Sequence, residues 1–225
     1  MYSTIEENYL KAILMLSRDT EDPISTSSIA RELDVNAASV TDMIQKRLLR
    51  KGLVDYQAYK GVRLTEKGSR VAVTVVRRHR IWEVFLVEKL HYDWEEVHDI
   101  AEQLEHVQST DLIDRLDDFL GHPVVDPHGG PIPGKDGQMR VPPRALLSSM
   151  QPGMKARILG VRDDTRELLS FLSANDLLPG TDIEVLEVFS FDQSVRLGTQ
   201  HGEKTVSRQV TDQVYVGVLE KGEGC

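Results

Sequence analysis

The sequence predicts a mostly α-helical chain that ends in a β-rich domain. Apolar residues recur at helical spacing up to about residue 120, a Pro/Gly-rich stretch follows, and short apolar-rich segments with strand character begin near Gln151. A chain of 225 residues can form two or three domains. We therefore expect a winged helix-turn-helix over 1–72, a helical domain over 73–140 and a small barrel over 150–222.

The first 50 residues predict three helices. Residues 4–17 repeat apolar side chains at helical spacing, which indicates an amphipathic helix. A Ser/Thr-rich cap region opens a second helix over 25–33, and a turn at 34–36 leads to a third helix over 37–50. Gly52 fits the end of that third helix.

Two short segments after the third helix predict the wing. Residues 53–59 and 62–65 alternate apolar and polar side chains, and Lys60 and Gly61 join them in a turn. Helix, tight turn, helix and hairpin together make a winged helix-turn-helix, a fold that docks on duplex DNA. A plain helical bundle with a solvated basic face is the alternative, and the hairpin disfavours it.

The rest of the chain changes from helices to strands. A long helix is expected from Thr65 to Leu90, with shorter ones over 94–107 and 110–120. Residues 121–143 contain six prolines and five glycines, so we expect a linker there. The later segments predict a small barrel: KARILGV, DIEVLEV, VRLGTQ, TVSRQV and VYVGVL.

Charge is unevenly distributed along the chain. The formal net charge is −9, yet residues 1–80 carry 14 Lys/Arg against 10 Asp/Glu, whereas residues 81–225 carry 13 against 26. Residues 46–80 alone hold 11 basic and two acidic side chains. A basic module joined to an acidic one favours double-stranded DNA as the partner of the N-terminal part.

The third helix and the wing supply the side chains expected to contact DNA. Small and polar residues on the exposed side of the helix fit the major groove and reach base edges or thymine methyl groups. Basic residues nearby suit phosphate contacts, which fix the register of the protein on the duplex. The predicted DNA-binding residues are Thr26, Ser27, Asn36, Ala38, Ser39, Thr41, Asp42, Gln45, Lys46, Arg47, Arg50, Lys60 and Arg63.

Two of the expected helices each carry a stripe of His and Glu, at spacings of three and four residues. Two such stripes could hold one or two divalent ions, whereas carboxylates packed together without a cation are costly to bury. Side chains of this kind are also common on solvated helix faces. The stripes are His79 and Glu83 on the first helix and His98, Glu102, Glu105 and His106 on the second. The remaining histidines are expected on the surface or in loops: His91, His122, His128 and His201.

Several classes of protein are disfavoured. No apolar run is long enough to cross a bilayer and the first residues do not resemble a secretory signal, so we expect a soluble cytoplasmic protein. The only cysteine, Cys225, allows neither an intrachain disulfide nor a Cys-based zinc site. A metalloenzyme is disfavoured because no nucleophile or general base accompanies the His/Glu stripes.

Four segments, taken in order, resemble the diphtheria-toxin-repressor family of metal-dependent transcriptional repressors: SVTDMIQKRLLRKGLVDYQAYKGVRLTEKG, RRHRIWEVFL, EVHDIAEQLEH and DPHGGPIPG. The resemblance covers residues 1 to about 140 and extends more weakly through an SH3-like C-terminal domain. It is closest to manganese-responsive members with such a domain. It implies a homodimer with contacts from helices over about 94–120, and therefore a palindromic operator.

The resemblance also implies two metal sites. One would use Asn8, Glu102, Glu105 and His106. The other would use His79, Glu83 and His98, completed by Asp164 and Glu167 from the SH3-like domain.

Three positions depart from related proteins. Iron-responsive members have Met at the position of Asn8 and Cys at that of Glu102, so the ligand set here is harder, which favours Mn²⁺. Short manganese regulators have Asp and Glu where this chain has Asn8 and Lys11. A protonated Lys11 cannot bind a metal.

We therefore expect a manganese-dependent repressor of metal-uptake genes, which is not an enzyme. Metal would connect the first helix, through Asn8, to the dimerisation helices and so favour the DNA-competent state. Two alternatives are an iron-dependent repressor of the same family and a winged-helix regulator that senses an organic ligand. Mn²⁺ is the expected cofactor, with Fe²⁺ as the alternative and Co²⁺ or Zn²⁺ as substitutes in vitro.

Overall fold

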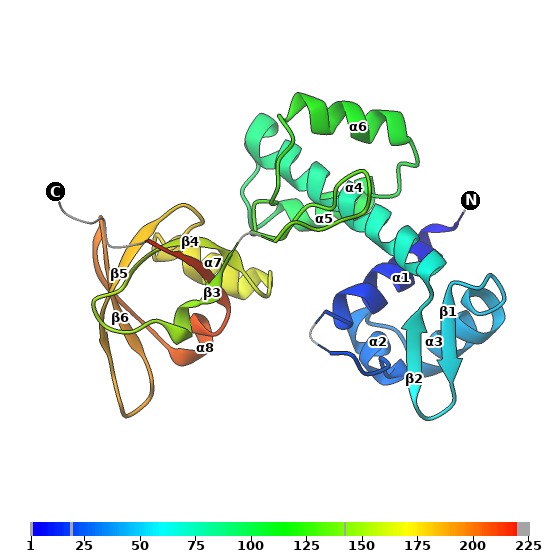
Figure 1. The fold of residues 1–225 in the computed structure, drawn as a ribbon, viewed down its shortest axis with the longest axis horizontal. Helices are drawn as coiled ribbons and strands as arrows, with labels where there is room; N and C mark the ends of the chain where they lie inside the picture. Colours follow the sequence, from blue (N-terminus) through cyan, green and yellow to red (C-terminus); the bar gives the residue numbers. More distant parts are fainter. Residues whose placement is uncertain (1, 19, 142, 220–225) are drawn as a thin grey trace. The chain divides into compact units, whose positions relative to one another are not determined.

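The computed structural model describes residues 2–18, 20–141 and 143–219; Cys225 lies outside these ranges. Two compact units make up the fold, and each is described by itself (Figure 1). The first comprises residues 1–79, 102–113 and 133–139. The second comprises residues 80–101, 114–132 and 140–225.

Three helices begin the first unit, as the sequence predicts. Each starts at a side chain that accepts a backbone N–H of the first turn, which satisfies a donor that the helix itself leaves free. The third helix continues beyond Met43 as a π-helical turn. The elements are α1 (Thr4–Leu16, capped by Ser3), α2 (Thr26–Glu32, capped by Ser25), α3 (Ala37–Met43, capped by Asn36) and η1 (Ile44–Leu48).

The predicted wing is present as the antiparallel hairpin of β1 (Val54–Gln57) and β2 (Gly61–Leu64). Its connection is residues 58–60, because Gly61 already pairs with Gln57. The hairpin and the three helices share one core, so the winged helix-turn-helix is confirmed. Fully buried residues of this core include Leu10, Ile13, Ile29, Val40, Ile44, Leu48, Leu53 and Val62.

Helix α4 (Glu66–Leu90) follows the wing and packs tightly against it at Gly68. A Cβ at Gly68 would lie 1.9 Å from the carbonyl oxygen of Leu53, a backbone atom. Gly68→Ala in an ordinary helix would stabilise by about 1 kcal/mol. Here we expect it to lower the free energy of unfolding by about 3 kcal/mol, because the helix start must move. Thermal or urea unfolding checks this, with Ser69→Ala as the matched control; equal stability of the two variants would contradict it.

Two shorter helices follow, α5 (Val97–Leu104) and α6 (Thr110–Phe119). The α5 helix is shorter at both ends than the predicted helix over 94–107, so Glu105 and His106 lie in the turn after it. Among the described residues, no helix is long and apolar enough to cross a membrane.

The Pro/Gly-rich segment is folded rather than extended over residues 124–139. Single β-bridges pair Val125 with Pro131 and Pro133 with Met139. Asp126 and His128 are buried, although His128 was expected among the surface and loop histidines. Hydrogen bonds from the backbone N–H groups of His128 and Gly130 to Asp126 explain why this turn can be buried. They satisfy backbone groups that a Pro/Gly-rich stretch otherwise leaves to water.

The C-terminal β domain is a six-stranded antiparallel sheet in the order β3-β8-β4-β5-β6-β7. In the described residues the edge strands β3 and β7 do not pair, so the sheet is not the closed barrel that we expected. The strands are β3 (Ala145–Leu146), β4 (Lys155–Val161), β5 (Asp182–Val188), β6 (Val195–Thr199), β7 (Gly202–Val206) and β8 (Val214–Val218).

Two helices accompany this sheet, α7 (Arg166–Ala174) and α8 (Arg208–Thr211). The expectation of a strand over TVSRQV is wrong in its second half, since Ser207 caps α8. Helix α7 was not predicted; Leu169 and Leu172 pack it into the core of the domain.

Candidate metal centre

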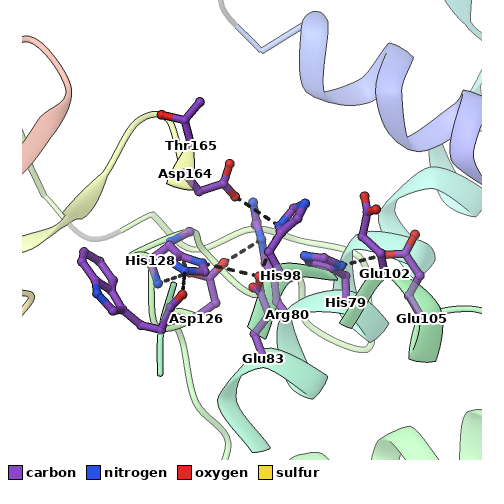
Figure 2. A network of polar contacts seen from close by, with 12 residues as sticks. His79, Arg80, Glu83, His98, Glu102, Glu105, Asp126, His128, Asp164 and Thr165 are labelled. Carbon is purple, nitrogen blue, oxygen red and sulfur yellow. Dashed lines mark hydrogen bonds and ion pairs between the residues drawn. The ribbon is translucent and has the colours of Figure 1, made fainter. Parts of the chain in front are cut away.

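Three buried side chains of the second unit bring atoms that can bind a metal close together. Glu83 from α4 and Asp126 and His128 from the turn after α6 have ligand atoms within 4.8 Å of each other. They are 1%, 7% and 4% exposed. Figure 2 shows them beside His98 and Arg80. We call Glu83, Asp126 and His128 the Glu83 centre.

The ring of His128 is fixed by its backbone partner. Its Nε2 lies 2.7 Å from the carbonyl oxygen of Trp94, and because a carbonyl can only accept, Nε2–H is the donor. Its Nδ1 therefore faces Glu83, 3.4 Å from Oε1. A backbone acceptor on one ring nitrogen is the usual way in which proteins orient the other nitrogen toward a metal.

The carboxylate of Asp126 is held from three sides. Its Oδ1 accepts the backbone N–H groups of His128 at 2.9 Å and Gly130 at 2.8 Å. Its Oδ2 lies 3.0 Å from Nε of Arg80, whose Nη1 donates to the carbonyl of Pro131. Since a carboxylate offers about four lone-pair positions, Asp126 retains capacity for one more partner.

The charges of the centre are strongly coupled. Burial alone would lower the pKa of His128, but its hydrogen bond to Glu83 and the charges of Glu83 and Asp126 raise that pKa to about 9. Burial, and then the like charge of Glu83, raise the pKa of Asp126 above its ordinary value. These two carboxylates therefore need positive charge beside them, as a proton on His128 or as a cation.

Two more predicted residues lie at the exposed edge of this centre. Nδ1 of His98, on α5, is 3.6 Å from Oε1 of Glu83 and 3.4 Å from Oδ2 of Asp164. Helix α7, just after Asp164, is joined to the turn before α5 by a hydrogen bond from Trp94 Nε1 to Ser173 Oγ at 2.8 Å. Glu167, by contrast, is exposed in the first turn of α7.

The raised pKa of His128 predicts a pH dependence of stability in metal-free protein. The folded pKa of about 9 exceeds the unfolded value near 6.5, so the stabilisation is complete below pH 6.5 and disappears as the pH rises through 9. Its size is on the order of 3 kcal/mol. Urea unfolding in EDTA at pH 6 and pH 9.5 measures this loss, and His128→Gln should reduce it. A loss of equal size in the variant would contradict the assignment.

A second polar cluster lies in the first unit around Lys11. Its Nζ is 2.7 Å from Oε2 of Glu105, 3.4 Å from Oε1 of Glu102 and 3.3 Å from Nδ1 of His79. Nδ1 of His79 is also 2.6 Å from Oε2 of Glu105, a contact visible in Figure 2. We call Lys11, His79, Glu102 and Glu105 the Lys11 cluster. Burial alone would raise the pKa of Glu105, but the hydrogen bond from His79 and the charge of Lys11 lower it.

A neighbouring ion-pair group is formed by Glu7. This buried carboxylate accepts from Nη2 of Arg78 at 2.9 Å and lies 2.8 Å from Nδ1 of His106. Oδ1 of Asn8 is a buried oxygen without a hydrogen-bond partner among the described residues. The predicted set of Asn8, Glu102, Glu105 and His106 is therefore present in one unit, but Lys11 and Glu7 contact three of its four members.

Sequence reasoning missed Asp126, His128 and Glu7. The segment DPHGG held a partial signal for the first two: Asp, Pro and Gly are typical turn residues, and such a turn carries an Asp and a His two residues apart. Glu7 stands beside Glu6 in the first turn of α1, where a solvated position is the ordinary expectation.

The predicted DNA-binding residues are all at least partly accessible. Thr26 and Thr41 are half-buried and the other eleven are exposed. The basic stretch over 46–80 is less available than its composition suggests, because Arg77, Arg78 and Arg80 are buried. Arg77 donates to the carbonyl of Pro133, and the other two contact Glu7 and Asp126. These three arginines therefore form contacts inside the protein and are not available to bind DNA phosphates.

A winged helix-turn-helix in a chain with a buried His/carboxylate centre is the architecture of a metal-responsive DNA-binding regulator. Comparison with known proteins agrees. Residues 1–62 match the iron-dependent repressor N-terminal DNA-binding domain, residues 65–134 the iron-dependent repressor metal-binding and dimerisation domain, and residues 145–217 the FeoA domain.

Individual relatives give the same result. The chain is 38% identical to the iron-dependent repressor IdeR of Mycobacterium tuberculosis over 128 residues, 57% of this chain and 55% of IdeR. It is 29% identical to the diphtheria toxin repressor of Corynebacterium diphtheriae over 192 residues, 80% of this chain and 84% of that protein. A solved manganese-dependent transcriptional repressor in complex with manganese has a TM-score of 0.84 at 34% identity, covering 95% of this chain and 100% of that one.

The chain belongs to the diphtheria-toxin-repressor family. The match spans only about half the length of the iron-dependent repressors that it resembles. The family membership predicted from the motifs is thus confirmed.

Proposed function

We propose that this protein is a manganese-dependent transcriptional repressor that binds a palindromic operator as a homodimer. The observation that carries the metal dependence is the Glu83 centre, in which two buried carboxylates face a histidine nitrogen whose ring is already oriented. DNA binding rests on the match of residues 1–62 to a DNA-binding domain and on the exposed face of α3.

The residues present fit a divalent ion. Glu83, Asp126 and His128 would hold it, with His98 and Asp164 as further donors at the exposed edge. A bound ion would supply the positive charge that allows these carboxylates to be ionised together. His128 must lose its Nδ1 proton to become a ligand, while Nε2–H keeps its bond to Trp94.

Coupling to DNA binding would run along α4. This helix starts against the wing at Gly68 and carries Glu83 four turns later without a break. Side chains that hold Glu83 in one position also restrain the helix to which the winged helix is attached. An ion that binds this restrained state better than other states shifts the population toward it. If the restrained state is the one that binds the operator, metal binding promotes repression.

Manganese is proposed over iron because the described ligands of the centre are carboxylate oxygens and imidazole nitrogens, without sulfur. Iron-dependent repression by the same residues is the second candidate, since IdeR is an iron-dependent repressor. Dimer contacts through α5 and α6 are proposed from the match to a dimerisation domain. We also propose metal-uptake genes as targets, the cytoplasm as the site of action, and domains over 1–72, 73–140 and 150–222.

The test is duplex binding with and without metal. Random duplexes are selected with Mn²⁺-loaded protein, and the selected duplex is titrated with protein in Mn²⁺, Fe²⁺ (anaerobic), Co²⁺, Zn²⁺ or EDTA at one salt concentration, because salt alone changes affinity. We expect Mn²⁺ to tighten binding and the selected sequences to be palindromic. Equal affinity in EDTA would refute metal dependence and favour a regulator that senses an organic ligand. A stronger response to Fe²⁺ would favour the iron-dependent repressor.

A further inference from the structure

We propose that the ammonium group of Lys11 is the permanent cation of the Lys11 cluster and excludes divalent metal from it. Each chain then binds its regulatory ion only at the Glu83 centre, a conclusion that rests on the proposed function. The inference concerns a cluster whose acidic residues alone, Glu102 and Glu105, would suit a metal.

The contacts place one positive charge where the negative charges meet. Lys11 Nζ lies 2.7 Å from buried Glu105, 3.4 Å from Glu102 and 3.3 Å from His79. These partners come from α4, α5 and the turn after α5, whereas Lys11 comes from α1. The ammonium therefore joins the same elements that a bridging ion would join.

A divalent ion could not share this position. Oε2 of Glu105 already lies within hydrogen-bond distance of Lys11 Nζ and of His79 Nδ1. Both lone pairs of that oxygen are therefore occupied, and a metal at Oε2 would have to displace at least one of the two contacts. A second cation a few ångströms from the ammonium would also be strongly repelled, because the site is largely shielded from water. Lys11 itself is only 13% exposed in its side chain.

The contacts of Glu7, also on α1, do not need a metal either. Glu7 is held by Arg78 and by His106, both within 3 Å. Together with Lys11, it joins α1 to α4 and to the residues after α5 entirely through protein groups. The attachment of α1 is thus a fixed part of the fold, and the metal response is left to the Glu83 centre.

Counting bound ions tests the proposal. Equilibrium dialysis against Mn²⁺, followed by metal analysis, should give one ion per chain for the natural protein and none for Glu83→Gln. Lys11→Met keeps the apolar stem but removes the charge, and should bind two ions. Lys11→Arg keeps a cation and should bind one. Two ions on the natural chain, or one ion on folded Lys11→Met, would overturn the proposal.

A further variant separates failure of this inference from failure of the proposed function. If Glu83→Gln still binds one ion, Glu105→Gln is added. Loss of that ion would place it in the Lys11 cluster and overturn the inference. Its retention would leave the exclusion intact and show that the Glu83 centre is not the metal site.

A stability measurement covers the case in which Lys11→Met folds poorly. In the Glu83→Gln background, Mn²⁺ should raise the melting temperature of Lys11→Met, since an ion that binds only the folded state stabilises it. The parent Glu83→Gln protein should show no such rise. A rise of equal size in both proteins would also overturn the proposal.

Discussion

Glu83→Gln is expected to abolish the effect of Mn²⁺ on DNA binding. Gln keeps the size of Glu83 but removes the charge that faces both His128 and His98. The affinity of the protein for Mn²⁺ should fall roughly 100-fold or more, since even partners of metal ligands contribute 10–100-fold. DNA binding in EDTA should remain that of the natural protein, because the winged helix is unchanged.

The measurement is fluorescence anisotropy of a labelled selected duplex over a range of Mn²⁺ concentrations. Glu88→Gln is the matched control: it makes the same chemical change on the same helix, where the side chain is 50% exposed and beside Lys89. The control should keep the full response. If Glu83→Gln also keeps it, the Glu83 centre is not the regulatory site, and a different ligand set must carry the signal.

Most of the fold could be predicted because the capping residues and the spacing of apolar side chains indicate the same helices and strands. Ser3, Ser25 and Asn36 each cap the helix that the apolar spacing predicts. The segments over 155–161 and 182–188 are strands over the predicted residues. Prediction failed where a contact distant in sequence decides the structure. Closure of a barrel, for example, depends on whether β3 meets β7, which no local pattern specifies.

The candidate site was predictable in its helical part only. Glu83 and His98 follow a helical ligand pattern, and the structure brings them together with Asp164. Asp126 and His128 lie in a Pro/Gly-rich turn, where periodicity gives no information about burial. Their positions depend on Arg80, on the carbonyl of Trp94 and on the close approach of Gly129 to Leu159, whose carbonyl oxygen would lie 2.4 Å from an added Cβ.

The structure changes which residues favour manganese. From the sequence this preference depended on Glu102 in the place of a sulfur ligand. In the structure Glu102 contacts Lys11. If Lys11 keeps metal out of this cluster, the oxygen ligand at position 102 cannot select manganese over iron. The Glu83 centre offers the same kind of ligand, oxygen and imidazole nitrogen, and the proposed preference for Mn²⁺ now rests on this centre.

Ala38→Glu is expected to abolish DNA binding without loss of stability. Ala38 is exposed in the first turn of α3, the helix predicted to enter the major groove. A carboxylate there meets the negative charge of the duplex, and like charges brought together cost several kcal/mol, which corresponds to a loss of about 100-fold or more in affinity. The same carboxylate lies at a helix N-terminus, where negative charge is mildly stabilising, so the winged helix should melt no earlier.

Two control variants test whether the loss of affinity comes from a negative charge at position 38. One controls for the size of the new side chain and the other for the change in net charge of the protein. Ala38→Gln adds a side chain of the same size without the charge and should lose much less affinity than Ala38→Glu. Thr74→Glu adds the same charge at an exposed position of α4 and should change DNA affinity little. Anisotropy titrations in saturating Mn²⁺ at one salt concentration compare the three variants. If Ala38→Glu binds as tightly as Thr74→Glu, α3 does not enter the groove, and a different surface of the first unit must read the DNA.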